Sequence, residues 1–173
     1  MIVVVLKKIN IDEYDQLVSC YSPELGKYVF VAKSASRSSS KQALHLEVLN
    51  LIEFSPVEGK SKMIITGADS VETFKGIKSS VRKLANAFLV LEVFDKLVPY
   101  AQVDDDLWDF LMKFLYGLER IKEPDVLNYM RETKKAVSQI LGYGEKDLDI
   151  LFSDIWGNRM NSLKFIKQLS PEF

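Results

Sequence analysis

One segment of this 173-residue chain carries basic side chains with no acidic side chain among them. The segment from Leu25 to Leu46 contains no Asp or Glu, and five serines lie between positions 34 and 40. Its candidate contact residues are Lys27, Lys33, Arg37 and Lys41, with His45 near the end of the segment. Cations attract phosphates, and serine hydroxyls and loop amides add phosphate contacts that carry no base information. The pattern predicts a local nucleic-acid binding surface, and a solvated, flexible loop is the alternative.

Four aromatic residues in or beside the same part of the chain offer related chemistry: Tyr14, Tyr21, Tyr28 and Phe30. Aromatic rings stack against the bases of single strands, at roughly 1–3 kcal/mol per base. In a small barrel such rings more often fill the core. The sequence alone leaves both uses open.

Residues for enzymatic or metal chemistry are sparse. One cysteine, Cys20, and one histidine, His45, cannot supply the four ligands of a structural zinc site. His45 lacks a nearby arrangement for nucleophilic catalysis, and the chain has no phosphate-binding loop, dinucleotide fingerprint or metalloprotease motif. The run Asp104–Asp106 suits a helix start, where carboxylates cap free amides, and a metal-dependent nuclease is the alternative. We expect a protein that is not an enzyme and has no metal or cofactor.

Net charge and hydropathy further limit the class of protein that this sequence can encode. Lys and Arg total 23 against 24 Asp and Glu, so a nucleic-acid site must be local rather than a global positive field. The opening apolar run ends at Lys7 and is shorter than a signal-peptide core. The longest internal apolar stretch, Ala87–Leu91, is far below the roughly 20 residues that span a bilayer. We expect a cytoplasmic protein without a membrane partner.

The elements that position the basic segment follow two periodicities. Short runs rich in Val, Ile, Phe and Tyr predict five strands at Ile2–Lys8, Gln16–Tyr21, Lys27–Lys33, Leu44–Phe54 and Ser61–Thr66. Pro23 and Gly26 mark a turn between the second and third runs, and Gly59 marks one before the fifth. Five short antiparallel strands with a longer loop after the third predict an OB-fold barrel, with an SH3-like barrel as the alternative.

From Ser70 onward a helical period replaces the strand pattern. We expect a helix over Val71–Val98 that Pro99 stops, a second after Asp104–Asp106, and a third with Pro124 near its start that ends near Gly142. Two short helices are expected at Glu145–Trp156 and Asn161–Leu169. The predicted fold class is α+β, with an OB-fold domain at 1–68 followed by an all-α helical bundle domain at 69–173.

The basic segment and its flanking strands resemble a known family. The order Glu13–Val18, Ser22–Lys27 and Val31–Ser40 is similar to the N-terminal OB domain of bacterial RecO proteins, with their Y-x-E-x-D-x-L strand, T-x-E-x-G-K turn and V-A-K-G-A-R-R-x-K-S segment. Ile140–Gly144 resembles the L-G-Y element that ends a RecO helix, and Asn161–Leu169 resembles the terminal helix of the family. The resemblance extends over nearly the whole chain.

The resemblance implies a nonenzymatic recombination mediator in DNA repair. Such a protein binds single- and double-stranded DNA, anneals complementary strands, and assists RecA loading with RecR and the single-strand-binding protein SSB. Lys33 and Arg37 take over the DNA contacts of the family's loop by position, whereas Lys27 and Lys41 are assigned from charge alone.

This chain departs from the family in its basic loop. Ser34 replaces the usual Gly, Ser36 the first Arg and Ser39 the second Lys. Fewer cations predict weaker DNA binding than is usual for the family. The alternative function is therefore an adaptor for SSB and RecR that has lost most DNA affinity.

The resemblance also implies a partner site and the loss of a metal module. In RecO proteins the helical domain receives the acidic, Phe-terminated tail of SSB in an apolar groove, and Arg131 with Lys134 or Lys135 is the candidate for its carboxylates. An exposed cluster on a solvated helix face is the alternative. Many RecO proteins hold a four-cysteine zinc module before the last helix; residues 144–160 contain no cysteine, so we expect no such module here.

Overall fold

The computed structural model describes residues 1–144, 146, 148, 150, 151, 161 and 162. The chain divides into two compact units, and each is described by itself. The barrel unit comprises Met1–Thr73 with Phe94–Trp108. The helical unit comprises Phe74–Val93 with the described part of 109–173. None of the helices within the described residues has both the length and the apolar composition needed to cross a bilayer.

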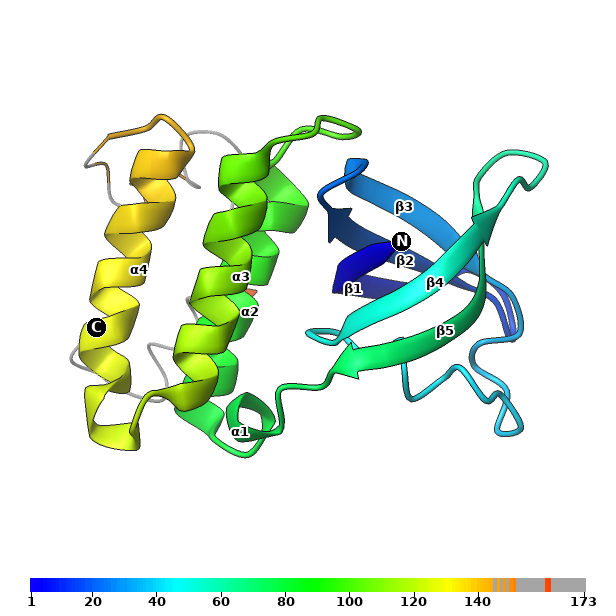
Figure 1. The fold of residues 1–173 in the computed structure, drawn as a ribbon, viewed down its shortest axis with the longest axis horizontal. Helices are drawn as coiled ribbons and strands as arrows, with labels where there is room; N and C mark the ends of the chain where they lie inside the picture. Colours follow the sequence, from blue (N-terminus) through cyan, green and yellow to red (C-terminus); the bar gives the residue numbers. More distant parts are fainter. Residues whose placement is uncertain (145, 147, 149, 152–160, 163–173) are drawn as a thin grey trace. The chain divides into compact units, whose positions relative to one another are not determined.

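Five strands form the barrel, and their order confirms the predicted fold. They are β1 (Ile2–Asn10), β2 (Gln16–Ser22), β3 (Gly26–Ala32), β4 (Leu51–Val57) and β5 (Ile64–Glu72). The sheet closes in the order β1-β2-β3-β5-β4, so that β1 also pairs with β4 (Figure 1). All pairings are antiparallel except the one between β3 and β5, which is a single parallel bridge from Val31 to Ile64. This mixed five-stranded closure is that of an OB-fold barrel.

The barrel interior is filled by alternate residues of the strands. In β2 and β3 the buried Val18 stands opposite the buried Phe30, and Phe30 meets Phe54 of β4 edge to face with ring centroids 5.1 Å apart. Tyr28 lies 5.0 Å from Phe30, and Cys20 is also buried in this core. The residues that fill the interior lie at every second position of their strands, as side chains of a pleated strand must.

The predicted fourth strand was wrong over its first half. Residues 44–50 form turns, and the strand begins at Leu51. Leu46 and Leu49 are nevertheless buried, and the Asn50 side-chain amide holds the turn by donating to the carbonyl oxygens of Leu44 (3.1 Å) and His45 (2.9 Å). Apolar residues therefore reach the core from a turn that resembles a strand in composition.

The predicted helix over Val71–Val98 was also wrong at its start. Strand β5 continues to Glu72 because Glu72 pairs with Leu51 in the β4 ladder. The chain then reverses at Phe74, which has a positive φ of 48°, before α1 (Lys75–Lys78) and α2 (Val81–Leu97). The predicted domain boundary between residues 68 and 69 stays a prediction.

The later helices follow the sequence signals. α2 ends two residues before Pro99, and α3 spans Asp105–Arg120 with the Asp104 carboxylate accepting a hydrogen bond from the amide of Leu107 at 3.0 Å. A 3-10 turn at Glu123–Asp125 contains Pro124 and leads into α4 (Val126–Ile140), as expected. The helices predicted at Glu145–Trp156 and Asn161–Leu169 lie largely outside the described residues.

Residues 94–108 complete the packing of the barrel unit. The buried Tyr21 packs against Phe94, at 5.2 Å between ring centroids, and against Trp108, at 6.4 Å. Its hydroxyl donates to the carbonyl oxygen of Asp104 at 3.2 Å, and burial raises its pKa to about 12. Tyr21 is therefore a core residue rather than a stacking surface for bases.

Candidate nucleic-acid interface

The acid-free segment includes β3 and most of the loop between β3 and β4, and Asp15 holds the first residues of that loop. One carboxylate oxygen of Asp15 accepts the Ser34 amide at 2.7 Å, and the other lies 3.5 Å from the Lys33 ammonium. The hydrogen bond from Ser34 and then the charge of Lys33 lower the pKa of this carboxyl. Because the pKa lies below its ordinary value, the carboxylate is charged at neutral pH and loses this contact only when the pH falls through the lowered pKa.

The backbone at Ser34 explains the glycine that the RecO pattern has there. Ser34 has a φ of 53°, in the left-handed region that glycine enters without steric cost. A residue with a Cβ costs roughly 1–2 kcal/mol in this conformation, partly offset by the larger conformational entropy that glycine loses on folding. The serine at this position therefore carries backbone strain.

We expect Ser34→Gly to raise the free energy of unfolding by about 0.5–1 kcal/mol, or roughly 2 °C in melting temperature. The Ser34 amide remains available to Asp15 in this variant, so the loop keeps its anchor. Thermal and urea unfolding followed by circular dichroism measure the change. Ser34→Ala removes the hydroxyl but keeps the Cβ, and it should not stabilise; equal stabilisation by both variants would contradict the role of φ.

Arg37 and Tyr14 form a second contact between this loop and the β1–β2 connection. The guanidinium carbon of Arg37 lies 4.5 Å from the centroid of the Tyr14 ring, a cation–π contact. The amide of Ser36 donates to the carbonyl oxygen of Tyr14 at 3.0 Å and holds the two segments together. Tyr14 is 37% exposed, so this ring lies at the surface.

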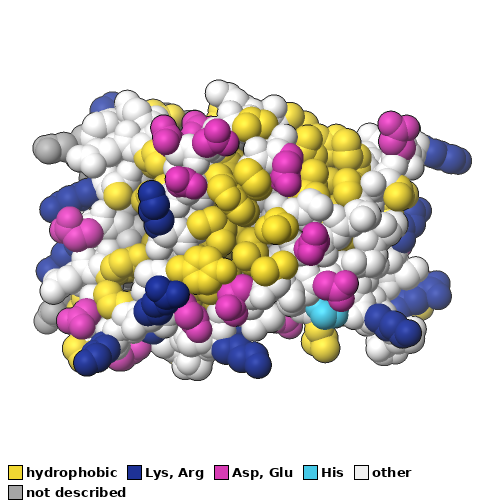
Figure 2. All heavy atoms as spheres, in the orientation of Figure 1, with side chains coloured by type: hydrophobic (Ala, Val, Ile, Leu, Met, Phe, Trp, Pro, Cys, Tyr) yellow, Lys and Arg dark blue, Asp and Glu magenta, His cyan; other side chains and the backbone are white. Residues whose placement is uncertain are grey.

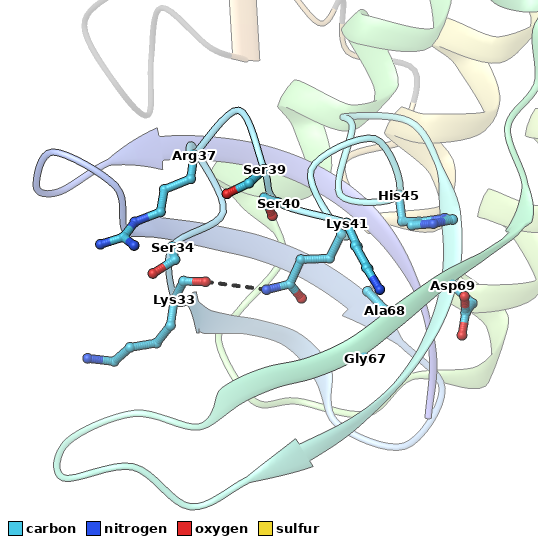
Figure 3. A pocket seen from close by; sticks show the side chains of 11 residues that line it. Lys33, Ser34, Arg37, Ser39, Ser40, Lys41, His45, Gly67, Ala68 and Asp69 are labelled. Atoms are coloured by element: carbon cyan, nitrogen blue, oxygen red, sulfur yellow. Dashed lines mark hydrogen bonds between the residues drawn. The ribbon is translucent and has the colours of Figure 1, made fainter.

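A hollow of about 530 Å³ opens over the loop and strand β5 (Figure 3). Lys33, Arg37 and Lys41 line it, so the structure brings together three of the four predicted contact residues. The rest of the lining is polar or small: Ser34, Ser39, Ser40, Gln42, His45, Gly67, Ala68 and Asp69. Figure 2 shows Lys and Arg side chains gathered beside His45 on this unit, in a protein whose net charge is only -1.

Lys27 does not line this hollow. Its ammonium donates to the carbonyl oxygen of Asp95 at 2.8 Å, and burial lowers its pKa. The Asp95 carboxylate in turn accepts from Ser19 at 3.0 Å and from Lys7 at 3.3 Å. Lys27 thus connects β3 to the end of α2 within the barrel unit.

His45 and Gly67 are among the lining residues of the hollow that were not predicted as contacts. His45 lies in a turn, and its Nδ1 accepts the Ser70 amide at 3.0 Å, so the proton of the neutral ring is on Nε2. Gly67, with a φ of 61°, forms a β-bulge with Ala68 opposite the single residue Phe54 of β4. An isolated glycine inside a strand pattern is the sequence signal that could have identified the bulge.

The helical unit has its own groove, of about 220 Å³, between α3 and α4. Its floor is aromatic: Phe114 is stacked between Phe110 (6.4 Å) and Tyr129 (6.0 Å), and the Tyr129 hydroxyl donates to the Phe114 carbonyl oxygen at 3.0 Å. The remaining lining residues are Lys113, Glu132, Thr133 and Ala136.

The predicted tail-binding cations are on α4 but do not line this groove. Arg131 and Lys135 are exposed, and the Lys135 ammonium lies 3.5 Å from the Glu132 carboxylate at the groove edge. Lys134 is half-buried. The cation that lines the groove is Lys113 of α3, which the sequence reasoning did not identify.

Among the described residues, no group of three or more His, Cys, Asp or Glu side chains is placed to hold a metal ion. The carboxylate of Asp104 is used as the helix cap described above.

Comparison with known proteins gives matches to one family. Residues 2–74 match the family model described as "Recombination protein O N terminal". Three relatives are each named DNA repair protein RecO. The protein of Dehalococcoides mccartyi is 29% identical over 123 residues, which is 71% of this chain and 49% of the relative. That of Caldicellulosiruptor saccharolyticus is 25% identical over 134 residues, 78% of this chain and 55% of the relative.

The third relative, from Listeria monocytogenes, is 24% identical over 131 residues, covering 76% of this chain and 51% of the relative. The chain thus spans about half the length of the curated relatives it matches. The barrel and its loop between β3 and β4 lie wholly within the matched residues 2–74. Residues 2–74 therefore match the N-terminal domain of the RecO family, and most of the chain is similar to proteins named DNA repair protein RecO.

Proposed function

We propose that this chain is a nonenzymatic DNA-binding mediator that anneals complementary strands and assists RecA loading together with RecR and SSB. The observation that supports it is the convergence of Lys33, Arg37 and Lys41 on one hollow of the barrel. Three cations with serine hydroxyls between them suit a phosphate backbone, which such groups bind without regard to sequence. The similarity to RecO proteins supports the same assignment.

The proposal is tested by binding and annealing measured together. Fluorescence anisotropy with labelled oligonucleotides over a salt series gives the number of phosphate contacts, and mixing complementary labelled strands gives the annealing rate. We expect affinity to fall as salt rises and annealing to be accelerated by the protein. Affinity that does not change with salt would contradict binding through these cations.

The groove of the helical unit suits the acidic, Phe-terminated tail of SSB. Its stacked aromatic floor offers an apolar seat for a terminal phenylalanine ring, for which edge and offset contacts are favourable. Lys113 lies in the groove, and Arg131, Lys134 and Lys135 lie on α4, so cations are available for the tail carboxylates. We therefore place the proposed tail between α3 and α4.

We expect Ala136→Leu, which fills part of the groove, to weaken binding of an acidic peptide ending in Phe about tenfold. The added side chain takes the space of the phenyl ring, whose burial contributes on the order of 1.5–3 kcal/mol. Isothermal titration calorimetry measures the affinity, with a peptide lacking the terminal Phe as the control ligand. Arg131→Ala should weaken binding of the same peptide, because the variant loses the positive charge of Arg131. Unchanged binding in that variant would show that Arg131 is not part of the site.

A second function rests on the serines of the loop. Ser34, Ser36 and Ser39 stand where the RecO pattern has Gly, Arg and Lys, which leaves fewer cations at the hollow. A protein that binds SSB and RecR but has little DNA affinity would fit this composition. The anisotropy series separates the two, because an adaptor binds the peptide without binding oligonucleotides. The absence of a zinc module from residues 144–160 stays a prediction, since most of this stretch lies outside the described residues.

A further inference from the structure

We propose that the connection between β1 and β2, residues 11–15, competes with DNA for Lys33 and Arg37 and thereby weakens DNA binding by the barrel. The inference rests on the proposed DNA binding and adds an autoinhibitory contact to it. It follows from the charge of the connection and from its contacts with two of the three cations that line the hollow.

The connection is acidic and lies against a loop that is basic. Asp12, Glu13 and Asp15 supply three carboxylates within five residues, and the connection contains no Lys or Arg. The two segments are joined through their backbones, because the Ser36 amide donates to the Tyr14 carbonyl oxygen at 3.0 Å. Opposite charges are thus held next to each other, where they attract.

Asp15 pairs with the first of the two cations. Its Oδ2 atom lies 3.5 Å from the Lys33 ammonium, and its side chain is only 20% exposed, so a negative charge is held beside the loop. The hydrogen bond from the Ser34 amide lowers the pKa of this carboxyl first, and the charges of Lys33 and Arg37 lower it further. Asp15 is therefore ionised at neutral pH and attracts both cations.

Glu13 and Tyr14 lie beside the second cation. The guanidinium carbon of Arg37 is 4.5 Å from the centroid of the Tyr14 ring. The hydroxyl of that ring donates to the Glu13 carboxylate, which raises the pKa of Tyr14. A negative charge therefore lies at the edge of the ring that Arg37 covers. Lys33 and Arg37 extend to the same side of the loop (Figure 3).

A phosphate of DNA must compete with these contacts. A cation binds a phosphate through the same charge that a carboxylate already attracts, so a paired lysine gains less from DNA than a free one. The carboxylates that remain nearby also repel the phosphates. Lys41 lines the hollow and makes no hydrogen bond or ion pair with the part of the chain that the structure describes, so it is open to DNA.

The double variant Glu13→Gln/Asp15→Asn tests the inference, because it removes two charges and keeps the shape of the connection. An amide oxygen can still accept the hydrogen bonds from Tyr14 and from the Ser34 amide. The backbone contact between the two segments does not depend on these side chains. The loop should therefore keep its position while the competing charge is lost.

Glu24→Gln/Asp106→Asn is the charge-matched control. Both residues are exposed members of the barrel unit. Glu24 lies in the turn between β2 and β3, so the length of β2 (Gln16–Ser22) separates it from the connection, and Asp106 lies in the first turn of α3. Circular dichroism melts establish that both double variants are folded.

The probe is a labelled single-stranded oligonucleotide of mixed sequence, titrated by fluorescence anisotropy. At about 0.05 M salt, where exposed charges are little screened, we expect Glu13→Gln/Asp15→Asn to bind about fourfold more tightly than the wild type, roughly twofold for each contact removed. The control should bind as the wild type does. In a Lys33→Ala/Arg37→Ala background, the same two amide substitutions should change the affinity by less than about twofold, because the cations for which they compete are gone.

The outcomes separate the inference from the proposed function. Equal or weaker binding by Glu13→Gln/Asp15→Asn would show that the connection does not inhibit, and DNA binding by the wild type would stand. An equal gain in the control, or a gain that persists without Lys33 and Arg37, would overturn the inference in favour of overall charge. Binding that appears only in the variant would support it. If neither the wild type nor the variant binds, the proposed function is wrong and the inference is overturned with it.

Discussion

Gly26→Ala should lower the free energy of unfolding by about 1.5–4 kcal/mol, or roughly 10 °C in melting temperature. Gly26 ends the turn between β2 and β3 with a φ of 65°. A Cβ there would lie 2.5 Å from the Gln102 carbonyl carbon and closer still to its oxygen. The substitution therefore adds backbone strain to a collision with another backbone segment.

The collision cannot be relieved by a side-chain rotation. The segment that carries Gln102 is fixed to β3, because the Ala101 amide donates to the Lys27 carbonyl oxygen at 2.8 Å and Tyr100 forms a parallel bridge with Lys27. Moving Gln102 away would break these contacts. Overpacking against a fixed backbone typically costs about 1–3 kcal/mol, and the left-handed conformation costs a further 0.5–1 kcal/mol or so once the entropy that glycine loses on folding is taken into account.

Urea unfolding monitored by tryptophan fluorescence gives the loss directly, since Trp108 packs on Tyr21 in the same unit. Gly142→Ala is the control, with a φ of 78° and no atom within 4 Å of its Cβ position. It should lose only the conformational part, about 0.5–1 kcal/mol. Equal losses in the two variants would show that the contact with Gln102 contributes nothing.

Replacing Lys33, Arg37 and Lys41 together with Ala should weaken binding of a single-stranded oligonucleotide roughly 50-fold at 0.15 M salt. Each phosphate contact on a single strand contributes about 0.7 to the slope of log affinity against log salt, so the slope should become shallower by about two units. The effect is large because these three cations line one hollow, and Lys33 keeps 63% of its side chain exposed although it lies near Asp15.

A charge-matched triple variant makes this measurement specific. Lys113, Arg120 and Lys135 are exposed cations of α3 and α4, and their replacement with Ala removes the same net charge. Anisotropy titrations at several salt concentrations should leave the affinity and slope of this control close to those of the wild type. A comparable loss in both triple variants would mean that overall charge, not the hollow, determines binding.

Lys27 should be left out of the barrel variant for a physical reason. Its ammonium donates to the Asp95 carbonyl oxygen, so Lys27→Ala leaves a half-buried acceptor without its partner. A loss of binding in that variant would be mixed with a loss of stability. Charge alone could not distinguish Lys27 from Lys33, because Asp95 is distant in sequence and only the folded barrel brings the two together.

The parts of the fold that could be predicted are those fixed by local chemistry. Runs rich in Val, Ile, Phe and Tyr located β1, β2 and β3, and Pro23 with Gly26 located the turn between two of them. Pro99 and Asp104 marked the end of α2 and the start of α3. Each of these signals acts within a few residues of its effect, so a single sequence carries it.

The features that the sequence did not predict depend on contacts between residues that are distant in the chain. The residues around Val71 match a helical period, but pairing with β4 keeps them in a strand up to Glu72. At the site, composition alone indicated the basic loop. The bulge at Gly67 was not predicted, because it follows from the register of β5 against Phe54 of β4. Likewise, nothing near His45 in sequence indicates that Ser70 orients its ring.

The composition of the barrel unit also sets the order of events during synthesis. The five strands are complete once Glu72 has been translated, but Phe94 and Trp108, which cover Tyr21, belong to the same unit and follow later. Folding on the ribosome proceeds from the N-terminus as residues emerge. The nascent barrel therefore leaves the exit tunnel with an uncovered tyrosine, and it reaches its final packing only after residues 74–93 of the other unit have already emerged.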